Sequence, residues 1–108
     1  MQKAYLNNIK AGLSAGYRLC IIDGEEGEVL AKTYSYKEAK EAVECMDITL
    51  IRWQTETTEA ERAEGAKPFK PVAVFAVALE YDKEPDETIY DMSANDIAEQ
   101  WFNEYLGL

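Results

Sequence analysis

The sequence predicts a single α+β domain over residues 1–108, in which a four-stranded, mainly antiparallel sheet carries helices packed on one face. Helical and β-prone segments alternate in the order α-β-β-α-β-β-α, without an internal repeat. Short linkers allow consecutive strands to pair, while the connection through the middle helix leaves the strand order open. Because 47% of the 108 residues are apolar, the chain can bury a core of its own.

The first half of the chain is expected to begin with a helix and a β-hairpin. Apolar residues fall on one face of a helix over residues 3–13. Residues 17–23 and 28–33 are rich in β-formers and flank Gly-Glu-Glu-Gly, whose two glycines supply the positive-φ positions of a tight reversal. The two strands are therefore expected to pair.

A second helix and a third strand follow. Ser35 can cap the helix, Glu38 stands in the capping-box position, and apolar residues then repeat at helical spacing for about three turns. Residues 47–55 alternate apolar side chains between two faces, which indicates a strand. Residues 56–70 lack apolar periodicity and are expected to form a surface loop.

The last third combines the most apolar strand with the clearest helix. Residues 72–79 are apolar on both faces, which is typical of a central strand or of one that meets a partner chain. After an acidic loop, Ser93 opens a helix that Gly107 closes. At about 100° per residue, its apolar residues share one arc of about 140°. These residues are Ala94, Ile97, Ala98, Trp101, Phe102 and Tyr105.

Negative charge is concentrated at the C-terminal end. Residues 80–108, hereafter the acidic C-terminal segment, hold nine acidic residues against Lys83 alone, a net charge of −8 in a chain whose total is −10. Such a segment repels nucleic acid and anionic membranes and attracts a basic protein surface at about a Debye length. We therefore expect a basic protein partner, no direct binding of nucleic acid and no membrane.

Several function classes are disfavoured by what the chain lacks. It has no histidine, the commonest general base and zinc ligand, and its glycines stand among acids that oppose a phosphate. Residues 82–93 begin like an EF-hand loop, but Glu87 replaces the required glycine and Ser93 the bidentate glutamate. No cofactor, no metal and no enzymatic activity are expected.

Cellular location and thiol chemistry follow from the apolar runs and the cysteines. The longest apolar run, residues 72–79, is far below the roughly 20 residues that span a bilayer, and no secretory signal pattern is present. A cytoplasmic protein is expected. Cys20 and Cys45 are then expected to be reduced core thiols, with a disulfide or redox pair as the alternative.

The candidate partner-binding surface combines residues 80–91, expected to be a loop, with the polar face of the last helix. Tyr90, beside Asp91, is the aromatic residue best placed for contact. Charge reversal at Glu99 and Glu104 is expected to abolish binding. The candidate residues are Asp82, Glu84, Asp86, Glu87, Asp91, Asp96, Glu99 and Glu104.

Size, charge and fold class together suggest a function. The chain is similar to small acidic accessory proteins of phages and mobile elements, some of which block host nucleases or restriction and CRISPR complexes by occupying a basic nucleic-acid channel. The first hypothesis is therefore a non-enzymatic inhibitor of this anti-CRISPR or anti-restriction type, acting as a nucleic-acid mimic. One alternative is a structural or regulatory homodimer through residues 72–79 or the open sheet face. Another is a small carboxylate- or thiol-dependent enzyme.

Overall fold

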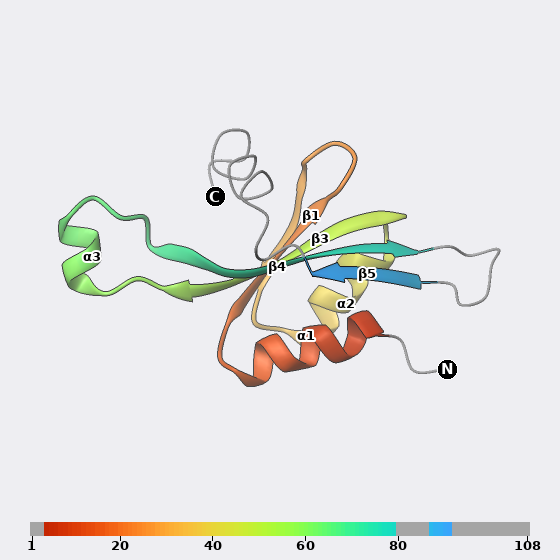
Figure 1. The fold of residues 1–108 in the computed structure, drawn as a ribbon, viewed down its shortest axis with the longest axis horizontal. Helices are drawn as coiled ribbons and strands as arrows, with labels where there is room; N and C mark the ends of the chain where they lie inside the picture. Colours follow the sequence, from red (N-terminus) through yellow and green to blue (C-terminus); the bar gives the residue numbers. More distant parts are fainter. Residues whose placement is uncertain (1–3, 80–86, 92–108) are drawn as a thin grey trace.

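The computed structural model describes residues 4–79 and 87–91 and confirms the α+β class. Helices and strands alternate along the chain, and the strands form one sheet (Figure 1). In the part described, no helix is both long and apolar enough to cross a membrane. The elements are α1 (Ala4–Ser14), β1 (Arg18–Asp23), β2 (Val29–Thr33), α2 (Tyr36–Glu44), β3 (Ile48–Glu56), α3 (Glu59–Ala63), β4 (Phe69–Leu79) and β5 (Glu87–Asp91).

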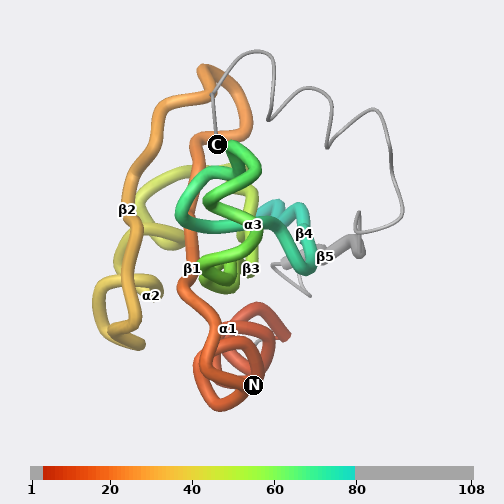
Figure 2. Tube along the Cα trace, turned by 90° about the vertical axis from the view of Figure 1, so that its left-hand side faces the viewer, coloured from red at the N-terminus to blue at the C-terminus, as the bar shows by residue number. Residues whose placement is uncertain are grey.

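The sheet is antiparallel throughout and has the strand order β2-β1-β3-β4-β5. Figure 2 shows β2, β1, β3 and β4 in this order from left to right, with α1 below them. The chain returns through α2 from edge strand β2 to β3, so β1 lies between them. The order that the sequence left open is therefore settled by this crossover.

The core lies between the sheet and the two long helices, which confirms the predicted packing of helices on one face. Alternate residues of β1, among them Leu19 and Ile21, point toward α1 and α2, as expected from the two-residue period of a strand. Burial of this apolar surface drives the packing of the two layers. The buried cluster consists of Tyr5, Ile9, Leu19, Ile21, Ala39, Ala42, Val43, Ile51 and Val77.

The four predicted strands are all present, and the sheet is larger than predicted by one strand. β5 pairs with β4, so the last five residues of the segment expected to be a loop, residues 80–91, form a strand instead. α3 lies within the other segment expected to be a loop, residues 56–70. The helix predicted from Ser93 onward lies outside the described residues.

The predicted cap of α2 is present in part. The Ser35 hydroxyl accepts a hydrogen bond from the backbone N–H of Glu38 at 3.3 Å. The Ser35 backbone N–H donates to the Thr33 hydroxyl at 2.9 Å, where a reciprocal capping box would have the Glu38 carboxylate. A complete capping box occurs instead at α3, between Thr58 and Glu61.

The predicted β1–β2 hairpin forms, but its two glycines serve different purposes. Gly27 has a positive φ of 73°, as the turn requires. Gly24 does not have a positive φ, and glycine is required there for another reason. A Cβ at this position would lie 2.5 Å from Cγ2 of Ile48. The Asp23 carboxylate closes the turn by accepting the backbone N–H of Glu25 at 2.9 Å.

Strands β3 and β4 continue beyond the helix-covered part of the sheet and form an arm, defined as residues 55–70, with α3 at its end (Figure 1). The two strands of the arm stay paired to Glu56 and Phe69. The Thr57 hydroxyl donates to the Lys67 carbonyl oxygen at 2.7 Å. The arm is therefore an ordered hairpin and not the irregular surface loop that the sequence predicted.

Candidate functional site

Two of the eight predicted partner-binding residues lie in the described part of the chain. Glu87 and Asp91 are the first and last residues of β5. The remaining six lie outside the described residues, so the structure neither brings them together nor separates them. They are Asp82, Glu84, Asp86, Asp96, Glu99 and Glu104.

The strand that carries Glu87 and Asp91 is an edge of the sheet. Glu87 is the register partner of Leu79, and Asp91 is the register partner of Phe75. The two acids are four residues apart, which corresponds to about 13 Å along a strand. Charged residues on an edge strand discourage pairing with other strands. These two acids therefore fit two roles: protection of the sheet edge against pairing with another strand, and the predicted binding of a basic partner.

Tyr90 belongs to the same strand and not to a loop, because it pairs with Ala76 of β4. The prediction that placed it beside a loop acid is wrong in this respect: pairing with β4 orders this part of the chain. Tyr34, which follows β2, is an aromatic residue that does reach the surface, with 56% of its area exposed. Exposed tyrosines are frequent anchors of protein interfaces.

The face of the sheet turned away from α1 and α2, hereafter the second face, gathers basic side chains. Lys32, Cys20 and Arg52 lie directly opposite one another on the neighbouring strands β2, β1 and β3. Arg18 lies two residues before Cys20 and therefore points to the same face. In a chain with 11 basic and 21 acidic residues, this is a local excess of positive charge.

The electrostatics of Cys20 reflect the same arrangement. Burial raises the pKa of the Cys20 thiol, and the charges of Lys32, Arg52 and Arg18 act in the opposite direction without overcoming it. A raised pKa keeps this thiol protonated and unreactive at neutral pH, unlike a catalytic nucleophile. The three cations thus surround a structural thiol.

The two cysteines differ in their surroundings. Both are free thiols, as expected, but only Cys20 is buried. Cys45 is exposed at the C-terminal cap of α2, where its thiol donates to the Ala42 carbonyl oxygen at 3.1 Å. The prediction of two core thiols is therefore right for Cys20 and wrong for Cys45, because the apolar face of α2 ends before it.

Arg18 connects the second face to the base of the arm. Its Nε and Nη2 atoms both donate to Oε1 of Gln54, at 3.2 and 3.0 Å. Its guanidinium carbon lies 3.5 Å from the centre of the Phe69 ring, in a cation–π contact. The arm is thus held to β1 by a side chain as well as by the β3–β4 ladder.

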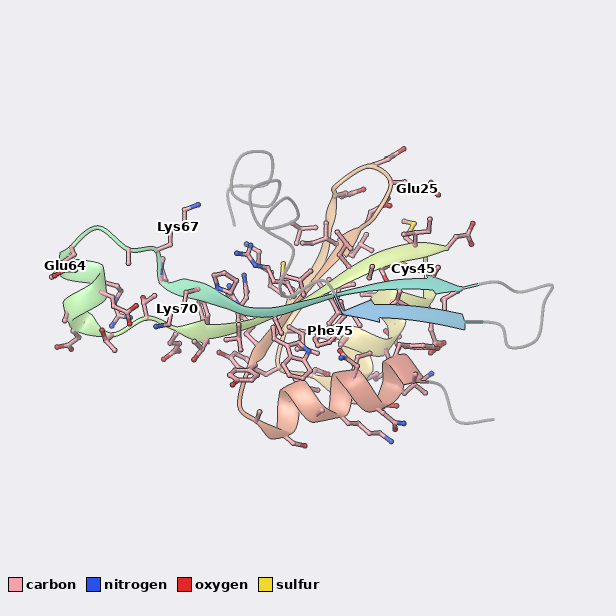
Figure 3. The ribbon with its side chains drawn as sticks, viewed as in Figure 1. Glu25, Cys45, Glu64, Lys67, Lys70 and Phe75 are labelled. Atoms are coloured by element: carbon pink, nitrogen blue, oxygen red, sulfur yellow. The ribbon has the colours of Figure 1, made fainter. Side chains whose placement is uncertain are left out.

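Charged residues of the arm stabilise its own conformation. The Lys70 ammonium forms an ion pair with the Glu61 carboxylate at 3.0 Å, and Arg62 donates to the Thr57 carbonyl oxygen. The pKa of Glu61 is lowered, first by the backbone N–H of Thr58 and then by Lys70. Figure 3 shows Glu64 at the outer end of the arm and Lys67 on the segment that returns to β4.

An aromatic cluster joins α1 to the helix-covered face. The ring of Trp53 stacks on Tyr17, with centroids 5.7 Å apart, and lies 5.0 Å from the ring of Phe75. Its indole N–H donates to Oδ1 of Asn8 at 3.2 Å. The periodicity of apolar residues within one helix or strand cannot predict this cluster, since its members come from α1, β3, β4 and the turn before β1. It is a packing feature that fixes the position of α1.

Pairing within the chain restricts the proposed homodimer contact through residues 72–79. β4 is a central strand, as the sequence indicated, and its residues Phe75–Leu79 pair with both β3 and β5. Among the described residues, only its first part, residues 69–74, has a neighbouring strand on one side alone. Pro71 lacks a backbone donor there, and a register shift at Val72 interrupts the ladder. In the described part of the chain, β2 is the edge strand opposite β5.

A metal centre has no counterpart in residues 4–79 and 87–91, where no group of three or more cysteine, aspartate or glutamate side chains could hold an ion. A scan against protein-family models and searches of curated proteins and of solved structures found no match to this chain. A proposed function therefore has to rest on the α+β fold, the distribution of charge along the chain and the burial of its reactive side chains.

Proposed function

We propose that this chain is a non-enzymatic protein-binding protein whose acidic C-terminal segment docks on a basic surface of a partner. The finer proposal is a cytoplasmic inhibitor of phage or mobile-element origin. It would occupy a basic groove of a CRISPR or restriction complex and so exclude nucleic acid from it.

The observation that carries this proposal is the separation of charge along the chain. Residues 80–108 contribute −8 of the total charge of −10. Attraction between such a segment and a basic groove acts over about 10 Å at 0.1 M salt and guides association as well as strengthening it. Grooves that bind nucleic acid carry Lys and Arg for the phosphates, so they have the complementary charge.

Burial and pKa values in the described residues fit a binding role better than a catalytic one. The buried thiol of Cys20 has a raised pKa, which disfavours nucleophilic chemistry. The only other thiol of the chain, Cys45, lies at the C-terminal cap of α2 and donates to the Ala42 carbonyl oxygen. A thiol-dependent enzyme is therefore the weaker hypothesis.

The experiment compares variants with equal changes of charge at two ends of the molecule. Asp96→Lys with Glu99→Lys changes the charge of the acidic C-terminal segment by +4. Glu25→Lys with Glu26→Lys makes the same change in the exposed β1–β2 turn and serves as the matched control. Each tagged protein is used for affinity capture from host lysate at low salt, and binding of the captured protein is then measured by titration.

The proposal predicts that the wild type and the turn variant bind, while the Asp96/Glu99 variant loses binding and keeps its circular dichroism spectrum. Binding by the wild type should also weaken steeply as salt rises. Equal binding by the two variants, or an affinity that does not respond to salt, would show that the acidic C-terminal segment is not the recognition surface.

A homodimer is the second candidate, and the open edge of β2 favours it. Val29 in this strand is 38% exposed, and no described strand pairs with its outer side. Two copies could extend the sheet across this edge, leaving the acidic C-terminal segment free. Light scattering at high micromolar concentration tests it: a mass near 12.2 kDa contradicts a dimer, and about twice that mass supports one.

A further inference from the structure

The central part of the second face, on β1, β3 and β4, is buried although no described helix lies over it, while Lys32 and Val29 at its β2 end are exposed. Cys20, Ile22 and Arg52 are 0% exposed, and Val74 is 6% exposed. α1 and α2 pack against the opposite face, and α3 lies at the end of the arm (Figures 1 and 2). A guanidinium as fully buried as that of Arg52 lies beneath a cover that excludes water.

The location of β5 determines which part of the chain can reach this face. Asp91 pairs with Phe75, and the neighbouring row across the sheet contains Val74, Arg52, Cys20 and Lys32. The chain therefore leaves β5 at the edge of the sheet, one residue from the row that holds the buried Arg52 and the exposed Lys32.

Length agrees with this connection. Four strand spacings separate β5 from β2, which is about 19 Å at roughly 4.8 Å each. A helix over residues 93–106, as the sequence predicts, rises about 21 Å. Such a helix is long enough to cross β4, β3 and β1, whose second-face residues are the buried ones, while β2 keeps Lys32 and Val29 exposed.

We propose that the second face is the docking surface for the chain's own residues 93–106, with their apolar arc against the sheet and Glu104 beside its cations. The apolar arc offers Ile97, Trp101 and Phe102 to a face that contains Ile22 and Val74. Removal of this apolar area from water favours the contact.

Helical geometry separates the acids of this segment into two groups. Glu104 follows Ile97 by seven residues, which is about 20° short of two full turns, so it borders the apolar arc. Asp96 and Glu99 lie on the opposite side of the same helix. Glu104 can thus meet Arg18, Lys32 or Arg52, while the other two acids point outward. This arrangement is independent of any partner. It presents Asp96 and Glu99 outward, as the proposed function requires, and it assigns Glu104, one of the candidate partner-binding residues, to the sheet instead.

The test uses Cys20 as a reporter in the full chain. Cys45→Ser removes the exposed thiol, so the rate of reaction with Ellman's reagent then measures the exposure of Cys20 alone. Trp101→Asp places a carboxylate in the apolar arc, and Asn103→Asp places the same charge on the outward side. We expect Trp101→Asp to raise the rate at least about tenfold, because local opening exposes the thiol in proportion to the open population. Asn103→Asp should leave it unchanged.

A second, milder pair keeps the proposal testable if Trp101→Asp prevents folding. Glu104→Gln should raise the reaction rate of Cys20 by several-fold, and Glu99→Gln should not. Equal rates for these two variants, or a Cys20 that stays fully protected in a folded Trp101→Asp variant, would overturn the docking proposal. So would protection that increases with protein concentration, since that would identify a second copy as the cover.

Discussion

Gly12 of α1 lies directly against the indole of Trp53 in β3, and replacing it with alanine should destabilise the protein. A Cβ at this position would lie 2.8 Å from Nε1 and 2.9 Å from Cε2 of Trp53, and 3.0 Å from Cδ2 of Leu19. The indole cannot move aside easily, because it donates to Asn8 and stacks on Tyr17. One added methyl group therefore has to displace either the ring or the helix.

The expected magnitude combines two opposing effects. Overpacking in a well-packed region costs about 1–3 kcal/mol. The higher helix propensity of alanine offsets about 1 kcal/mol of this. We therefore expect Gly12→Ala to lower the free energy of unfolding by about 1 kcal/mol. Asn7→Ala, at an exposed position of the same helix, should instead raise it by a few tenths.

A double-mutant cycle with Trp53→Phe, measured by urea denaturation, tests the cause. The smaller ring lacks the two atoms nearest to the new methyl group, so Gly12→Ala should be neutral or stabilising in that background. The coupling between the two sites should reach about 1 kcal/mol. The reasoning is refuted if Gly12→Ala stabilises the wild type, or if its effect is the same in both backgrounds.

Two further predictions concern caps and charges. Ser35→Ala removes the hydroxyl that accepts a hydrogen bond from the Glu38 N–H. It should lower the free energy of unfolding, measured by urea denaturation, by about 1 kcal/mol. An unchanged free energy would show that the cap does not stabilise the protein. Because the pKa of Glu61 is lowered from 4.5, its contribution to stability is present above that value and is lost as the pH falls through the lowered pKa. Lys70→Met removes the ion pair and should raise the pKa of Glu61, which stays below 4.5 because the Thr58 N–H still donates to the carboxylate. An NMR titration of the Glu61 carboxyl measures this pKa. The same pKa in wild type and variant would contradict the ion pair.

Local patterns were sufficient to predict the helices of the core and four of the strands. The alternation of apolar residues in β1 and their helical repeat after Ser35 each reflect burial on one face. Burial on one face produces the periodicity from which an element can be predicted. Residues 72–79 were predicted to be central because they are apolar on both faces. β4 is central, with β3 and β5 as its neighbours.

The two elements that the sequence analysis missed have weaker local signals. α3 has no buried residue, so it shows no apolar periodicity, but Thr58 followed by Glu61 is a capping-box pattern that could have located it. β5 has Thr88, Ile89 and Tyr90 between two acids. Such a short segment becomes a strand through its pairing with β4, and tertiary pairing of this kind decides β structure more than intrinsic preference does.

The cationic second face depends on register and could not be predicted from sequence. Lys32, Cys20 and Arg52 come from three strands, and they share one row only because β1 lies between β2 and β3. The strand order was open in the sequence analysis. The acidic C-terminal segment, in contrast, could be found without any structure, because its excess of acidic residues is visible in the sequence of residues 80–108.

Displacement of nucleic acid from the captured partner tests the central claim most directly. A fluorescent oligonucleotide is bound to the partner, and its anisotropy is followed while this protein is added at about 0.1 M salt, where the Debye length is about 10 Å. The account predicts displacement by the wild type and by the Glu25/Glu26 variant, and none by the Asp96/Glu99 variant. Binding of the wild type without displacement of the oligonucleotide would contradict the account.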